Sequence, residues 1–352
     1  MSFINEKIEA NREQTARRDY AGRVQRMSRF VFDPEAVSDR LQERIVGQAE
    51  TLQALTAMLV RVKADIGPED RPLAVHMLMG PTGVGKTETV RLLAEAIHGK
   101  RDALCRVDMN TLAQEHYVAA LTGAPPGYVG SKEGHTLFDT EAIQGSFSKP
   151  GIVLFDEVEK ASPEVVRTLL NILDSGRLVF PSGQQEIDFR NSLIFMTSNV
   201  GALEAARYRD TFRRGWRRWL GLIPRREAEV LEAALLNTFD PEFINRIDGI
   251  HTYNRLGIDR LDDLLSIQLA RLNQRLSRRG ASVELTEALR EYLCGRYDNR
   301  FGARDILRRL RSTLEPPLAE ALLAHPDVGA FRGYLRGGAV CVEPVTVPGE
   351  PA

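Results

Sequence analysis

Residues 73–87 read LAVHMLMGPTGVGKT, and this stretch indicates most strongly how the chain folds. Its first seven residues are apolar apart from one histidine, which is typical of a buried strand. The next eight fit the pattern GxxxxGK[ST] fully, and Lys86–His98 has the spacing of an amphipathic helix. A glycine-rich turn between a strand and a helix N-terminus directs backbone N–H groups inward, where they can wrap a phosphate. We therefore expect Lys86 to reach the β- and γ-phosphates of a nucleotide and Thr87 to bind Mg²⁺.

A second apolar run ends in two acidic residues. Residues 152–157 read IVLFDE. A buried strand here would deliver Asp156 to the carboxyl edge of the sheet, where it can hold Mg²⁺ through water. Glu157 could then polarise the attacking water as a general base. Strand ends are often acidic, so this interpretation depends on the position of the motif after the phosphate-binding loop.

Strand and helix patterns alternate along the first two thirds of the chain, which predicts an α/β fold with a parallel sheet covered by helices on both faces. The expected strands are 73–79, 104–108, 152–155, 193–197 and 250–253. Helical patterns follow from residue 259 to 325, with one short strand at 339–342. The expected domains are a polar helical extension (1–40), a large α/β domain (41–254), a small helical domain (255–346) and a tail (347–352).

Composition excludes several classes of protein. The chain has 352 residues, of which 43% are hydrophobic and 27% charged, as in ordinary globular domains. The net charge of −1 disfavours a general polyanion binder. Three widely separated cysteines provide neither a metal cluster nor a disulfide framework, which indicates a reducing compartment. We find no export signal and no apolar run of about 18 residues, and therefore expect a cytoplasmic protein without a membrane span.

These motifs, with six further segments, resemble an AAA+ ATPase of the Clp unfoldase family. The match is closest to the second ATPase module of ClpA, ClpB and ClpC. The segments lie in family order and are RIVGQ (44–48), GPTGVGKTE (80–88), GAPPGYVG (123–130), LFDEVEKASPEV (154–165), LLNILDSGRL (169–178), IDFRNSLIFMTSN (187–199), PEFINRID (241–248) and FGARDI (301–306). The resemblance implies a P-loop NTPase sheet with a helical lid, and ATP with Mg²⁺ as ligands. ClpA, ClpB and ClpC carry two ATPase modules, whereas this chain has one phosphate-binding loop.

The resemblance also implies a set of nucleotide contacts. Ile45 and Val46 would line the adenine pocket, and Thr87 and Asp156 would bind the metal. The remaining contacts to the nucleotide would come from Pro81, Thr82, Gly83, Val84, Gly85, Lys86 and Arg304.

Three further residues would take part in hydrolysis beside Glu157. By the same resemblance, Asn199 would be sensor 1 and orient the attacking water, Arg246 would be an arginine finger that reaches the neighbouring subunit's γ-phosphate, and Arg304 would be sensor 2. Phosphoryl transfer needs cations where negative charge spreads in the transition state, so these roles make physical sense. Without the resemblance, a surface salt bridge would be the default interpretation of either arginine.

The segment GYVG at 127–130 places an aromatic side chain between glycines, directly after two prolines. This pattern favours an exposed loop. In the family, the tyrosine here grips polypeptide in the pore of a ring, which implies that Tyr128 and Val129 form a substrate-binding pore loop. A tyrosine ring offers apolar area to any side chain and so binds without sequence preference. The alternative is a turn with a packed tyrosine.

An insertion at 203–227 holds eight arginines and both tryptophans. In ClpA-type unfoldases this interval bears a loop that docks on the ClpP peptidase, and the tripeptide Leu220-Gly221-Leu222 fits the pattern of that loop. Arginine and tryptophan are typical of binding hot spots. The interval remains open to three readings: peptidase docking, another acidic partner, or a solvated amphipathic helix.

The function that the sequence favours is an ATP-dependent unfoldase that threads polypeptide through the pore of a homo-oligomeric, hexameric ring. It could feed a ClpP-like peptidase or receive substrate from an adaptor protein. Two alternatives stay open. One is an ATP-dependent remodeller of a specific complex without a peptidase, and the other is a nucleic-acid-associated AAA+ ATPase. The exposed Tyr128 argues against nucleic acid, and the arginine-rich insertion argues weakly for it.

Overall fold

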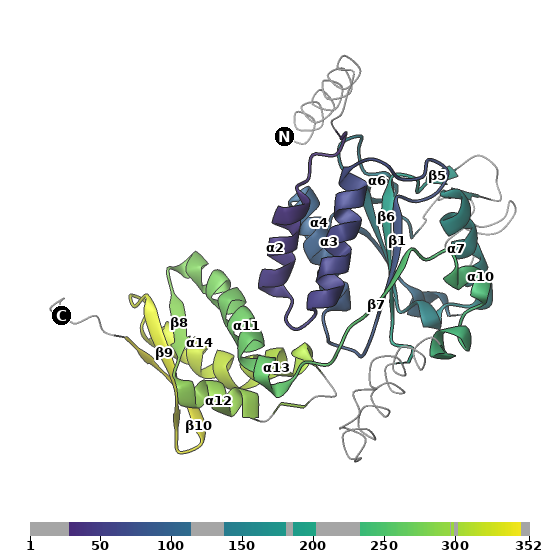
Figure 1. The fold of residues 1–352 in the computed structure, drawn as a ribbon. Coiled ribbons are helices and arrows are strands. Elements are labelled where there is room, and N and C mark those ends of the chain that lie inside the picture. Colours follow the sequence, from purple (N-terminus) through teal and green to yellow (C-terminus); the bar gives the residue numbers. More distant parts are fainter. Residues whose placement is uncertain are drawn as a thin grey trace, which may run out of the picture. The chain divides into compact units, whose positions relative to one another are not determined.

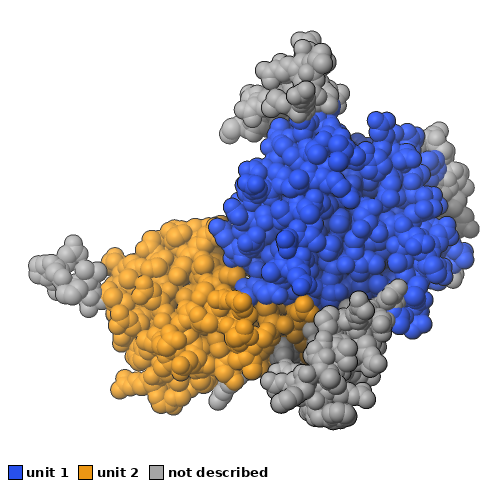
Figure 2. Space-filling model, viewed as in Figure 1, with its two compact units in different colours: residues 1–81, 85–253 blue, residues 82–84, 254–352 orange. Residues whose placement is uncertain are grey.

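The computed structural model describes residues 28–113, 137–180, 186–201, 233–295, 297–298 and 302–345. The chain divides into two compact units (Figure 2). Unit 1 contains residues 1–81 and 85–253, and unit 2 contains residues 82–84 and 254–352. None of the helices in the described ranges combines the length and the apolar composition that crossing a bilayer requires.

Unit 1 is built on a five-stranded parallel sheet with the strand order β2-β3-β6-β1-β7. The strands are β1 (Ala74–Met79), β2 (Cys105–Asp108), β3 (Gly151–Asp156), β6 (Ser192–Ser198) and β7 (Gly249–Thr252). Each of the five strands expected from the sequence is present, and the α/β fold is confirmed. Every residue of β1, β3 and β6 is buried, because the middle strands of a parallel sheet are covered on both faces.

Helices flank this sheet, with α2, α3 and α4 on one side and α7 and α10 on the other (Figure 1). The helical elements of unit 1 are α2 (Pro34–Arg44), α3 (Ala49–Lys63), α4 (Lys86–His98), η1 (Met109–Leu112), α6 (Thr140–Gln144), η3 (Val158–Lys160), α7 (Pro163–Ser175) and α10 (Pro241–Ile244). A short antiparallel hairpin, β4 (Arg177–Val179) with β5 (Glu186–Asp188), follows α7. The core between α7 and the sheet is apolar, for example at Val153, Phe155 and Leu169.

The start of the described chain packs into unit 1. Phe30, Phe32, Val37 and Leu41 are all buried, and the Asp33 side chain caps α2 by accepting a hydrogen bond from the Glu35 N–H. The sequence led us to expect a polar extension up to residue 40. That pattern is dominated by the charged outer face of α2, which hides the few apolar residues that anchor the segment.

Unit 2 is mainly helical, as the sequence predicts, and its first helical element is η5 (Ile258–Arg260). Its helices are α11 (Leu261–Leu276), η6 (Ser277–Arg279), α12 (Glu287–Gly295), α13 (Ala303–Arg309), the π-helical η7 (Leu310–Leu314) and α14 (Glu315–Ala324). The wide π turn leads directly into Pro316 and Pro317, which lack an N–H and whose rings crowd the preceding turn.

A three-stranded sheet completes unit 2, where the sequence led us to expect a single strand at 339–342. It consists of β8 (Ser282–Leu285), β9 (Ala330–Arg336) and β10 (Ala339–Pro344) in the order β10-β9-β8. A tight turn joins β9 to β10 through Gly337 and Gly338, both with positive φ. The strand β8 is only four residues long, and in β9 a buried glycine, Gly333, stands where an apolar side chain would mark the covered face, which obscures the strand pattern in the sequence.

Candidate functional site

The loop at residues 80–85 joins β1 to α4. Gly80 has φ +143°, and a Cβ atom built on it would lie 2.4 Å from the backbone oxygen of Tyr253, so only glycine fits. Gly85 has φ +111° and precedes the first residue of α4. Ile45 is buried against this glycine, and Val46 beside it is half-buried. The loop therefore opens toward the N-terminus of α4, the arrangement in which backbone N–H groups can bind phosphate.

Two buried hydroxyl groups, those of Tyr253 and Thr89, form a chain of hydrogen bonds that ends at the last residue of the 80–85 loop. The Tyr253 hydroxyl donates to Thr89 Oγ1 at 2.8 Å, and Thr89 Oγ1 donates to the carbonyl of Gly85 at 3.0 Å. Burial raises the pKa of Tyr253, so this hydroxyl stays protonated and acts as a donor. The end of β7 and the first turn of α4 thus fix the base of the loop.

Lys86 is the first residue of α4 and is 8% exposed. Its ammonium group donates to the carbonyls of Gly80 (2.6 Å) and Pro81 (2.9 Å) and to Asn199 Oδ1 (2.9 Å). These acceptors hold the charge over the loop, where it can neutralise phosphate. Asn199 follows β6, and its backbone N–H donates to Glu159 Oε1 at 3.1 Å. The structure thereby brings the lysine and the expected sensor 1 residue into direct contact.

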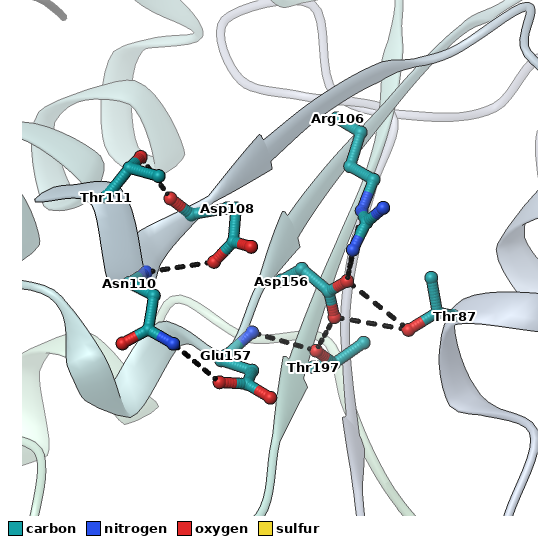
Figure 3. Close-up of polar contacts among 8 residues, drawn as sticks. All are labelled: Thr87, Arg106, Asp108, Asn110, Thr111, Asp156, Glu157 and Thr197. Carbon is teal, nitrogen blue, oxygen red and sulfur yellow. Dashed lines mark hydrogen bonds and ion pairs between the residues drawn. The ribbon is translucent and has the colours of Figure 1, made fainter. Parts of the chain in front are cut away.

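Asp156 ends β3, is 6% exposed, and receives hydrogen bonds from three other elements (Figure 3). Thr87 Oγ1 of α4 lies 3.2 and 3.4 Å from its two oxygens. Arg106 of β2 donates to Oδ2 through Nε (3.1 Å) and Nη2 (2.6 Å), and Thr197 of β6 donates to Oδ1. A buried carboxylate beside a hydroxyl presents the oxygen ligands that Mg²⁺ prefers. Thr87 and Asp156 therefore fit a magnesium ion chemically.

Glu157 follows Asp156 and adopts a left-handed backbone conformation with φ +59°. A non-glycine residue in this region costs about 1–3 kcal/mol, and such residues cluster at functional sites. The half-buried side chain accepts a hydrogen bond from Asn110 Nδ2 at 3.3 Å, and the backbone N–H donates to Thr197 Oγ1 at 2.9 Å. Asn110 is itself oriented by its backbone N–H, which donates to Asp108 Oδ1 at 3.0 Å.

The two arginines expected to take part in hydrolysis have no contact with Asp156 or Glu157 among the interactions of the described residues. Arg246 lies just after α10, with its Nε 3.0 Å from Asp174 Oδ1 at the end of α7, and its backbone oxygen accepts from Arg71. Arg304 is an exposed residue in the first turn of α13 in unit 2. Its neighbour Ala303 donates its N–H to the carbonyl of Gly83 at 2.9 Å, and Gly83 also belongs to unit 2.

Two groups of expected functional residues lie outside the described residues. The pore-loop residues Tyr128 and Val129 fall in the interval 114–136. The tripeptide Leu220-Gly221-Leu222 falls in the interval 202–232, together with the whole arginine-rich insertion at 203–227. Their roles remain predictions from the sequence.

Three residues that contact Asp156 or Glu157 are not among the expected site residues: Arg106, Asn110 and Thr197. One signal could have revealed them. Each lies close to the carboxyl end of a predicted strand, where the strand ends of a parallel sheet meet, and a polar residue there stands out against apolar neighbours. The threonine is the clearest case, because it follows four apolar residues in LIFMT.

Comparisons with known proteins identify relatives of both units. A family model described as "AAA domain (Cdc48 subfamily)" matches residues 71–250, and one described as "C-terminal, D2-small domain, of ClpB protein" matches residues 256–329. The chain is 50% identical over 311 residues to "ATP-dependent protease ATP-binding subunit-like protein AmiB" of Pseudomonas aeruginosa, covering 86% of this chain and 83% of that one.

Two further relatives extend this picture. Over 316 residues the chain is 45% identical to "ATP-dependent protease ATP-binding subunit-like protein" of Rhodococcus erythropolis, covering 88% of this chain and 89% of that one. It is 38% identical over 289 residues to "ATP-dependent Clp protease ATP-binding subunit ClpC" of Staphylococcus saprophyticus. That match covers 82% of this chain and only 34% of the ClpC protein. The chain thus spans about a third of this longer relative.

Proposed function

The chain belongs to the Clp-type AAA+ ATPases, and from that premise we propose that it is an ATP-driven protein unfoldase that works as a ring. It binds nucleotide and is an ATPase. Its membership of the Clp family supports a role as an ATP-dependent chaperone or unfoldase. The finer assignments below, to individual residues, to Mg²⁺ and to partners, are our proposal.

The observation that best supports the residue assignments is the convergence of Lys86, Thr87, Asp156 and Glu157 at the carboxyl edge of one sheet. We assign Lys86 to the β- and γ-phosphates, and Thr87 and Asp156 to Mg²⁺. The metal would neutralise charge on the phosphates when bound. Ile45 and Val46, beside Gly85, are placed to contact the adenine.

Hydrolysis needs a water molecule that is both positioned and polarised. Glu157 is the proposed general base, and Asn110 and Thr197 hold its side chain and its backbone N–H. Asn199 would help to orient the water, since its side-chain oxygen already accepts a hydrogen bond from Lys86 beside the phosphate-binding loop. Cations must meet the charge that develops on the transferred phosphoryl group. We assign this role to Arg246 of a neighbouring subunit and to Arg304.

The assembly follows from the arginine finger. If Arg246 acts across an interface, active sites lie between subunits, and a closed ring, proposed here to be a hexamer, is the simplest arrangement that completes every site. In this ring Tyr128 and Val129 would face the pore and move with the nucleotide state, pulling a polypeptide through. We propose that the ring works in the cytoplasm.

A matched pair of variants tests the pulling mechanism. We expect Tyr128→Ala to hydrolyse ATP almost normally and to lose the unfolding of a tagged, folded test protein, because the loop would contact substrate and not nucleotide. Tyr128→Phe keeps the aromatic ring and should retain unfolding. A parallel loss of hydrolysis and unfolding in Tyr128→Ala would instead indicate a structural tyrosine.

We also propose that the ring delivers substrate to a ClpP-like peptidase. Two relatives that match over most of their length carry names that describe ATP-binding subunits of ATP-dependent proteases, which supports this partner. The docking element would be Leu220-Gly221-Leu222. Replacing both leucines with alanine should abolish co-purification with such a peptidase and leave hydrolysis unchanged. If the intact ring does not bind the peptidase, the remodeller without a peptidase becomes the better description.

A further inference from the structure

Thr197 connects the two acidic residues of the site through one oxygen atom. Its hydroxyl donates to Asp156 Oδ1, and the same oxygen accepts the backbone N–H of Glu157 at 2.9 Å (Figure 3). The side chain is 1% exposed and lies near the end of β6, between β3 and β1 in the sheet. None of the sequence motifs gives Thr197 a role.

The directions of both bonds are fixed by chemistry. A carboxylate can only accept, and a backbone N–H can only donate, so the atom between them must do both. A hydroxyl group meets this requirement with one hydrogen and two lone pairs. Its β-branched side chain has restricted rotation about χ1, which keeps the oxygen in place. Within this buried strand, Thr197 is therefore suited to a specific polar task and not only to packing.

The backbone of Glu157 needs such support. Its left-handed conformation is unfavourable for a residue with a Cβ atom and persists only where the surroundings hold it. The bond from its N–H to Thr197 fixes the peptide that precedes the side chain. Asn110 touches the far end of the same side chain, 3.3 Å from Oε2. The glutamate is thus held at both ends, and Thr197 provides the backbone anchor.

We propose that Thr197 is a positioning residue, which sets the metal-binding carboxylate of Asp156 and the general base Glu157 in one fixed arrangement. This inference rests on the proposed roles of those two acids. In this arrangement the geometry of the base depends on the geometry of the metal ligand, because a single hydroxyl group fixes both. Thr197 itself contacts no reacting atom in this proposal.

Two pairs of variants that differ only in the hydroxyl group test the proposal. The first is wild type against Thr197→Val, and the second is Thr197→Ser against Thr197→Ala. We expect the hydroxyl-free member of each pair to lose about 10²-fold in kcat, the cost typical of a misplaced catalytic group. KM and the Kd for nucleotide at saturating Mg²⁺ should change little. Thr197→Ser should recover most of the wild-type kcat.

A second readout does not depend on turnover. The Mg²⁺ concentration that half-saturates the Mg²⁺-dependent part of ADP binding should rise about tenfold in Thr197→Val, as is typical when a partner of a metal ligand is removed. Thermal melts of each variant establish that it is folded. If Thr197→Val does not fold, the serine and alanine pair supplies the same comparison in a smaller side chain.

The Glu157→Gln background separates positioning from general damage. At saturating Mg²⁺, which offsets the effect on the metal ligand, adding Thr197→Val to Glu157→Gln should lower kcat far less than adding it to wild type, because Thr197 then acts through Glu157. An equal loss in both backgrounds, or a normal kcat in Thr197→Val, would overturn the proposal. A failure of the proposed function looks different, because Glu157→Gln would then itself retain near-normal turnover.

Discussion

The two units each contain a buried aspartate, and the two aspartates differ in where their hydrogen-bond partners lie along the chain. Asp156 in unit 1 is 6% exposed and Asp305 in unit 2 is 1% exposed, and each meets arginine. The partners of Asp305 are close in sequence. They are the N–H of Asp298, Arg308 three residues on and Arg309 four residues on. The partners of Asp156 come from α4, β2 and β6, far apart along the chain.

This difference separates a structural carboxylate from one that belongs to a site. The bonds of Asp305 hold the start of α13 and cannot be exchanged without opening that turn. The hydroxyl of Thr87 and the partly exposed guanidinium of Arg106 can move when a ligand supplies charge in their place. We therefore expect changes around Asp156 to alter catalysis and ligand dependence, and changes around Asp305 to alter stability alone.

The largest effect should come from a residue that lies outside the cluster around Asp156. Arg246→Ala should bind ATP yet hydrolyse it about 10³-fold or more slowly, because an arginine finger is worth that much in related reactions. Mixing it with Lys86→Ala protein should restore part of the activity, and activity per subunit should rise with protein concentration. A monomer with concentration-independent turnover would contradict the ring.

The next prediction compares two variants of unit 1, one that should lose nucleotide binding and one that should lose hydrolysis. Lys86→Ala should lose nucleotide binding, since its charge acts on the phosphates in the ground state. Glu157→Gln should bind ATP and lose about 10²–10⁴-fold in kcat, the usual contribution of a general base. Equilibrium binding of a fluorescent ATP analogue and steady-state hydrolysis measure the two properties. Near-normal turnover in Glu157→Gln would remove it from the catalytic role.

Asp305→Asn should reduce stability without changing the intrinsic chemistry. Hydrogen bonds to a charged group contribute about 1.5–3 kcal/mol, so we expect a loss of about 2 kcal/mol in the free energy of unfolding, measured in urea. Asp259→Asn, at an exposed position of unit 2, is the matched control. A loss of kcat in folded Asp305→Asn at saturating ATP would break the contrast between the two aspartates.

The pH dependence of this effect has a definite sign. Burial raises the pKa of Asp305, but the hydrogen bonds from Asp298 and Arg308 and the charge of Arg309 outweigh it and leave the pKa below its ordinary value. A lowered folded-state pKa contributes stability that is present above the unfolded pKa of about 3.9 and lost as pH falls through the folded value. The difference between wild type and Asp305→Asn should therefore shrink in acid.

The smallest effect we predict is also the most specific. Arg106→Gln should lower the stability of the nucleotide-free protein by about 1 kcal/mol, because its partly exposed guanidinium is screened by solvent. Mg²⁺ with ADP should restore that stability by supplying charge to Asp156. Arg309→Gln, which removes a partner of Asp305, should not be rescued by the same ligands. If Mg²⁺ with ADP rescued both variants or neither in thermal shift assays, the proposed difference between Asp156 as a site residue and Asp305 as a structural residue would be wrong.

Much of the fold could be predicted from the sequence, because the middle strands consist mostly of apolar residues and the glycine-rich loop between a strand and a helix is specific to one structure. The small sheet of unit 2 was missed except for β10, since β8 is only four residues long and Gly333 interrupts the apolar face of β9. The extent of the N-terminal packing was missed because the apolar run at 30–32 is only three residues long and stands between charged residues. Local patterns reveal strands that are buried on both faces better than strands that are covered on one.

Some residues of the site could likewise be predicted from the sequence and others could not. Lys86, Thr87, Asp156 and Glu157 stand in short motifs whose spacing encodes their geometry, and the structure brings them together. Arg106, Asn110 and Thr197 join them only through the order of strands in the sheet, which places β2, β3 and β6 side by side. That order is a property of the fold, so no pattern along the chain pairs Thr197 with a glutamate 40 residues earlier.

The most direct test of the central claim, that hydrolysis at this edge of the sheet drives unfolding, is to follow the native fluorescence of a folded fluorescent protein that carries an unstructured tail. With wild-type protein and ATP we predict loss of the fluorescence, and with Glu157→Gln and ATP we predict that the fluorescence persists. ATP hydrolysis by wild type at an undiminished rate, with the test protein still folded, would contradict the account.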